Sequence, residues 1–152
     1  METPLDPMTQ LREQERAASL PYTEYPPTPT WFPVATGLWF TALLAAMLYL
    51  RDSWTYAPVV ALLVAFELGF LAWYRKKRGT MPSLRGAPRE FRRACTQYLV
   101  GVVVVLLVVG AAALWLPHVV ALLLCFALVT AGTAAYERVY ARAAEATRAR
   151  LR

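Results

Sequence analysis

Histidine and cysteine are scarce in this sequence of 152 residues, which contains one histidine and two cysteines. A haem held by two histidines of one chain is therefore excluded, and a metal site is not expected, because zinc and iron sites need several such ligands. Cys95 is expected at one membrane interface and Cys125 inside an apolar stretch, nearer the other interface, so a disulfide between them would have to span much of the bilayer. We expect both to be reduced thiols.

The sequence also lacks the local motifs of enzyme active sites. It has no glycine-rich nucleotide loop, no pair of acidic residues at acid–base spacing, and no nucleophile beside a base. We therefore predict no catalytic residues, no metal, no cofactor and no enzyme activity. Nucleic-acid binding is not expected either, because the most basic segment offers only Phe91 for base stacking and contains no known binding module.

Polar sequence is in short supply, since 58% of the residues are hydrophobic and the mean hydropathy is +0.38. Four apolar stretches are each close to the roughly 20 residues that a bilayer requires. They cover residues 34–50, 57–74, 98–116 and 119–136. The sequence thus predicts an all-α membrane protein with four transmembrane helices.

Two short corners divide these stretches into two helical hairpins. A continuous helix over residues 98–136 would be about 58 Å long, nearly twice the thickness of the hydrocarbon core, so the chain must fold back within it. Pro117 lacks an amide hydrogen and clashes with the preceding helical turn, which makes it the natural corner. Residues 51–56 form the corresponding corner between the first two helices.

The basic residues orient this arrangement. If every stretch crosses the membrane once, fifteen of the sixteen Lys and Arg residues lie on one side, and Arg51 lies on the other. The loop 75–93 and the tail 137–152 carry most of them, so the positive-inside rule places both termini in the cytoplasm. Fourteen Arg against two Lys is typical of a high-GC bacterial genome, which indicates a bacterial plasma membrane.

Aromatic residues near the ends of the stretches agree with these boundaries, because rings with a polar edge prefer the membrane interface. The expected inner belt consists of Trp31, Phe32, Trp73, Tyr74, Tyr98, Tyr136 and Tyr140. The expected outer belt consists of Tyr49, Trp54, Tyr56 and Trp115.

The polar ends of the chain are expected to differ in structure. Residues 1–30 form a proline-rich acidic leader with no apolar signal-peptide core, and we expect it to be partly disordered, with a short polar helix over Thr9–Ser19. Docking of this leader on the oppositely charged loop is the alternative. The basic tail 137–152 is expected to continue the fourth helix.

Glu67 is the single charged residue in the four apolar stretches, near the middle of the second. A charge at that depth costs at least about 2.5 kcal/mol, so the carboxyl group should be protonated, partnered or exposed to water within a bundle. The hydroxyl groups of Thr41 and Thr130 lie at matching depths and are the expected partners, with a second subunit as the alternative. Glu67 is interpreted as a proton- or cation-coupling group, as a structural link between helices, or as a lipid-facing side chain that snorkels toward the interface.

A stripe of small residues on the same helix is suited to close packing against a neighbour. It lies roughly opposite Glu67 and consists of Ala61, Ala65, Gly69 and Ala72. Thr36, Thr41, Thr130 and Thr133 are expected to bond to their own helix backbone.

The basic loop is the candidate contact for anionic lipids or another polyanion, since each Lys or Arg near a membrane surface contributes about 1 kcal/mol. Its candidate residues are Arg75, Lys76, Lys77, Arg78, Arg85, Arg89, Arg92 and Arg93.

These features favour an accessory, scaffolding or regulatory subunit that acts through helix packing and a basic cytoplasmic face, with other membrane subunits or a parallel second copy as partners. One alternative is a parallel homo-oligomeric transporter or channel that uses Glu67. The chain is similar in length to the small multidrug-resistance transporters and also has one membrane Glu, but theirs lies in the first helix. A strong charge bias opposes the antiparallel pairing of such families. The other alternative is a lipid-binding or membrane-shaping protein, whose two-hairpin layout resembles that of reticulon-type proteins.

Overall fold

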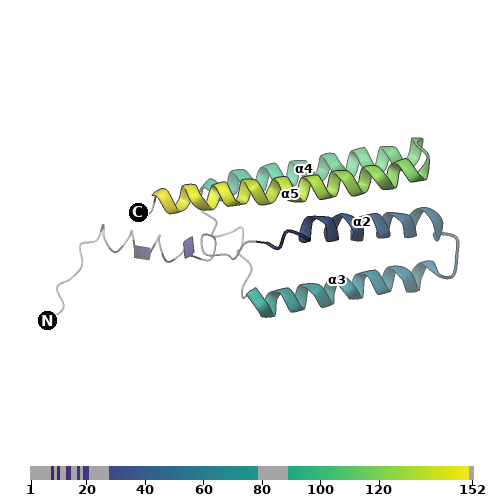
Figure 1. Cartoon of the computed structure of the whole chain (residues 1–152), viewed down its shortest axis with the longest axis horizontal. Coiled ribbons are helices and arrows are strands. Elements are labelled where there is room, and N and C mark those ends of the chain that lie inside the picture. The colour runs from purple at the N-terminus through teal and green to yellow at the C-terminus, as the bar shows by residue number, and fades with distance from the viewer. Residues whose placement is uncertain are drawn as a thin grey trace.

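The computed structural model describes residues 28–78 and 89–150, together with isolated helical positions between residues 8 and 20. It contains four long helices, shown in Figure 1: α2 (Phe32–Tyr49), α3 (Tyr56–Arg78), α4 (Arg89–Trp115) and α5 (His118–Arg150). Each is long and apolar enough to cross a membrane. The prediction of an all-helical chain with four potential membrane spans is therefore confirmed. The expected order or disorder of the leader concerns residues that lie mostly outside those described.

Both corners are closed by backbone hydrogen bonds. After α2, the amide of Ser53 donates to the carbonyl of Leu50 (2.8 Å), and that of Tyr56 donates to the carbonyl of Ser53 (3.1 Å). After α4, the amide of Val120 donates to the carbonyl of Pro117 (2.9 Å) in the first turn of α5. The chain therefore reverses at Pro117, where a proline cannot continue the helix.

Three of the helices extend four or more residues beyond their apolar stretches. The α5 helix has 33 residues, or about 50 Å of length, whereas the hydrocarbon core is about 30 Å thick. It continues unbroken through the basic tail as far as Arg150. Residues 75–78 and 89–93, which were expected in the loop, also belong to helices, because Arg and Lys are good helix formers and do not interrupt α3 or α4. Residues 79–88 are not among the residues that the structure describes.

The α5 helix is the centre of the packing. It pairs extensively with α4 on one side and with α2 on another, whereas α3 contacts α2 over a much smaller area. Figure 1 shows α2 between α5 and α3, with α3 running in the opposite direction along α2. Buried positions in the spans are mostly small, which permits close approach of the helix backbones. They include Gly37, Ala46, Ala112, Ala121 and Cys125.

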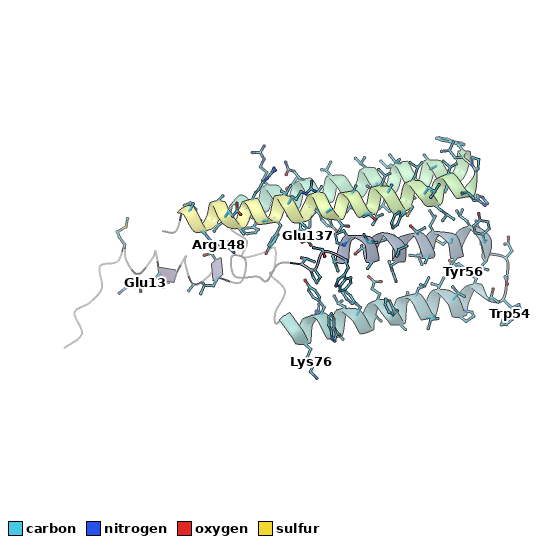
Figure 2. All side chains as sticks on the ribbon, in the orientation of Figure 1. Glu13, Trp54, Tyr56, Lys76, Glu137 and Arg148 are labelled. Carbon is cyan, nitrogen blue, oxygen red and sulfur yellow. The ribbon has the colours of Figure 1, made fainter. Side chains whose placement is uncertain are left out.

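Aromatic rings gather at the end of the bundle from which the basic segments emerge. Phe70 stacks on Phe32 at 6.0 Å between ring centroids and also contacts Trp31, Trp73 and Tyr74, which ties α2 to α3. On the other helix pair, Tyr98 lies 4.5 Å from Tyr136, and Phe91 lies 4.9 Å from Tyr140. Tyr49 and His118 meet at the opposite end, 5.3 Å apart. Figure 2 shows Trp54 at that opposite end and Lys76 at the basic one.

Candidate functional site

The α3 helix is the least covered of the four. None of its residues from Tyr56 to Lys76 is buried within the chain. All four residues of the small-residue stripe, Ala61, Ala65, Gly69 and Ala72, are exposed, and a Cβ atom placed on Gly69 would meet no atom within 4 Å. The close packing that this stripe is suited to is therefore not supplied by the described part of the chain.

Glu67 lies on the face of α3 that is turned toward α2. Half-buried residues of α3 recur at helical spacing on this face, among them Leu63, Phe70 and Tyr74, and Glu67 is one turn from Leu63 and from Phe70. Unlike them, Glu67 is exposed. Its carboxylate makes no hydrogen bond or ion pair with any described residue. The charged group thus stands beside α2 without a partner among the described residues.

Trp39 of α2 is the polar link nearest to Glu67. Its indole Nε1–H donates a hydrogen bond of 3.1 Å to the carbonyl of Leu63. In an α-helix this carbonyl also accepts the amide of the residue four positions later, which here is Glu67. The indole therefore meets α3 next to the backbone of Glu67, and its N–H group is already engaged.

The two threonines proposed as partners of Glu67 face α5 and α2 instead. Thr41 Oγ1 donates to the carbonyl of Gly37 at 2.8 Å, and its side chain lies near that of Cys125 on α5. Thr130 Oγ1 is buried against Gly37 and has no hydrogen-bond partner among the described residues. The structure consequently does not bring Glu67 together with either hydroxyl group within one chain.

Threonine bonding to the helix backbone was predicted correctly at three of four positions. The hydroxyl groups of Thr36, Thr41 and Thr133 donate to the carbonyls four residues earlier, at 2.8–2.9 Å. The prediction for Thr130 was wrong, because its hydroxyl group is turned toward the space that Gly37 leaves open on α2. Both cysteines are free thiols, as expected, with Cys125 buried in the α2–α5 contact region.

The described basic residues of the segment 75–93 lie beside the aromatic clusters. Arg75 and Lys76 follow Tyr74 directly on α3, whereas Arg92 and Arg93 lie in the first turns of α4, and all four are exposed. Lys77, Arg78 and Arg89 are placed on helical backbone, and Arg85 lies outside the described residues. The basic residues therefore come from both ends of the segment 75–93 and do not converge on one cavity in the described structure.

Sequence reasoning missed Trp39 and Gly37 as positions that determine the packing. A tryptophan several residues inside an apolar stretch was a usable signal, because a buried indole N–H usually requires an acceptor. Gly37 carried no such signal, since several other glycines in the spans have open space around them.

No group of three or more His, Cys, Asp or Glu residues that could hold a metal ion occurs in residues 28–78 and 89–150. Comparison with known proteins gave no match to a family model, to a curated protein or to a solved structure.

Proposed function

We propose that this chain is an integral protein of a bacterial plasma membrane, without catalytic activity, that serves as an accessory, scaffolding or regulatory subunit of a larger membrane assembly. In this proposal α2 and α3 form one transmembrane hairpin, α4 and α5 form the other, and both termini lie in the cytoplasm. The concentration of exposed Lys and Arg at one end of the helices supports that orientation.

The observation that carries the proposal is the uncovered state of α3. A helix that only filled the bilayer would not need a stripe of small residues, because lipid chains pack equally well on Leu or Val. Helix association in membranes depends on close van der Waals contact, and small residues permit it. The stripe from Ala61 to Ala72 is open within the chain, so it supplies a surface for another helix.

The test is purification from the native membrane in a gentle detergent, with the mass of the complex measured. We expect a species heavier than the 17.0 kDa chain, with a second protein present at constant stoichiometry. Gly69→Leu should release that protein, because it fills the open stripe. The matched control is Gly110→Leu on α4, another glycine with nothing within 4 Å of its Cβ position. Isolation of a bare monomer, or equal retention in both variants, contradicts the proposal.

Contact with anionic lipid is a second candidate function, favoured by the exposure of Arg75, Lys76, Arg92 and Arg93 beside the aromatic clusters. Each such residue near the surface contributes about 1 kcal/mol of attraction to an anionic headgroup. Native mass spectrometry of chain reconstituted with phosphatidylglycerol should show fewer retained lipids for the double variant Arg92→Gln, Arg93→Gln. Arg51→Gln, at the opposite end, is the control, and equal losses would rule the candidate out.

A further inference from the structure

We infer that Glu67 recognises a transmembrane helix of another protein that carries a lysine or arginine at mid-membrane depth. The inference rests on the proposed function and specifies the chemistry of the partner. It begins from the one charged side chain within the four apolar stretches, which has no hydrogen bond or ion pair with the described residues of its own chain.

The depth of Glu67 excludes the membrane surface as its partner. It is seven residues from Tyr74, or about 10 Å along the helix axis, and lies close to the middle of the span. A glutamate side chain is too short to reach the headgroups from there, unlike the long stems of Lys and Arg. Phe66 and Leu68, which flank Glu67 about 100° to either side on the helix, are 68% and 62% exposed, so the open sides of α3 next to the carboxylate are apolar.

A second copy of the chain offers little to such a carboxylate. Its four apolar stretches contain no basic residue. The hydroxyl group of Thr41 is bonded to Gly37, that of Thr130 is buried under α2, and the indole of Trp39 is bonded to Leu63. At this depth a second copy would therefore present another Glu67, which supplies no positive charge to the carboxylate.

A basic residue on a foreign helix satisfies the carboxylate by charge complementarity. Ionisable groups inside membranes commonly pair with one another, because each is costly to insert alone. Glu67 is exposed although it lies on the α2 side of α3, because α3 contacts α2 over only a small area, so a further helix can reach the carboxylate beside α2. The ion pair between Glu67 and this basic residue would define both the depth and the identity of the foreign helix. The small-residue stripe would allow close packing on the opposite face of α3.

The experiment uses the full chain in liposomes with a synthetic leucine-rich transmembrane peptide that carries one central lysine. Association is measured by fluorescence energy transfer, and peptides with a central leucine or a central glutamate serve as references. We expect the lysine peptide to bind the chain about tenfold more tightly than the leucine peptide, and the glutamate peptide to show no gain. Equal binding of the lysine and leucine peptides would overturn the inference.

Two variants distinguish recognition from general adhesion. Glu67→Leu should reduce binding of the lysine peptide to the level of the leucine peptide. Adding Leu68→Glu to that variant returns a carboxylate at nearly the same depth, but about 100° around the helix. It should not restore full binding. Complete restoration, or Glu67-dependent self-association of the chain without peptide, overturns the assignment of a foreign basic helix.

The same variants separate this inference from the proposed function. If Glu67→Leu keeps its native partner after gentle purification, the inference fails while the accessory role stands. If the unaltered chain is recovered without any partner, the accessory role fails, whatever the lysine peptide does.

Discussion

At the scale of single residues, Gly37 determines how closely α2 and α5 approach. A Cβ atom at this position would overlap Thr130 Oγ1, and it would lie 3.2 Å from both Phe126 Cδ2 and the Phe126 carbonyl oxygen. One neighbour is a short branched side chain and another is backbone, so neither can move away easily. The Thr130 hydroxyl group occupies the space that a Cβ atom on Gly37 would fill.

Gly37→Ala should therefore destabilise the chain, by about 1–3 kcal/mol, because overpacking outweighs the better helix propensity of alanine. Thermal unfolding in detergent, followed by circular dichroism, measures the effect. Thr130→Ala in the same chain should recover part of the loss, since it removes the overlapping hydroxyl group. Gly69→Ala is the control and should be neutral or slightly stabilising, because its Cβ meets nothing within 4 Å. An unchanged midpoint for Gly37→Ala would show that the two helices are not packed this closely.

Trp39 provides a second prediction at this scale. Trp39→Phe keeps an aromatic ring but removes the donor to the Leu63 carbonyl. That carbonyl retains its helical partner, so we expect a modest loss of about 0.5–1.5 kcal/mol. Trp54→Phe, at a ring that is 87% exposed, should leave the unfolding midpoint unchanged. If both substitutions have the same effect, the indole hydrogen bond does not hold α2 to α3.

At the scale of helices, α4 and α5 remain packed beyond the apolar stretches. Phe91, Ala143 and Ala144 form a buried cluster with Tyr140 packed against it. Ala94 and Thr147 are buried as well. In the proposed topology residues 137–150 lie past the fourth apolar stretch, so this cluster would form a small core outside the bilayer, where the hydrophobic effect contributes to packing.

Overfilling this cluster should separate α4 from α5 beyond the apolar stretches without disturbing the spans. Ala144→Leu adds a bulky side chain at a position that is 6% exposed, at a cost of about 1–3 kcal/mol. Trypsin should then cleave sooner after Arg138 and Arg142, as mass spectrometry of the fragments would show. Ala141→Leu, at an exposed position on the same helix, should leave the cleavage rate unaltered. Similar rates for the two variants would contradict a packed core in this region.

The helices themselves could be predicted, whereas their packing could not. The apolar runs and Pro117 predict the corner between α4 and α5, because the length of an apolar run and the missing amide hydrogen of proline can be read from the local sequence. The extension of α5 to Arg150 followed from the helical spacing of its tail. Which face of a span is buried does not follow, since a helix that is apolar on every side carries no amphipathic pattern. The pairing of α5 with α2, and the position of Thr130 against Gly37, depend on contacts between distant segments of sequence.

At the scale of the whole molecule, charge and aromatic rings divide the bundle into two unlike ends. Figure 2 shows Lys76 and Arg148 toward one end and Trp54 and Tyr56 at the other. Exposed basic residues of α3, α4 and α5 all lie at the first end, beside the two ring clusters. Moving that end across a membrane would require the transfer of many arginines, each at a cost of about 2.5–3.5 kcal/mol at the centre of a helix.

A single orientation should therefore be found for every copy, with the α2–α3 corner outside and the end of α5 in the cytoplasm. Single cysteines at Trp54→Cys and Ala149→Cys, in a chain with Cys95→Ser and Cys125→Ala, report on the two ends. A membrane-impermeant maleimide should label the first in intact bacterial cells and the second only after the membrane is permeabilised. The chain without cysteines controls for background labelling. The opposite pattern would reverse the orientation, whereas partial labelling of both sites in intact cells would indicate dual insertion. Dual insertion would restore the antiparallel pairing that the charge bias opposes, and with it a transport pathway between inverted copies.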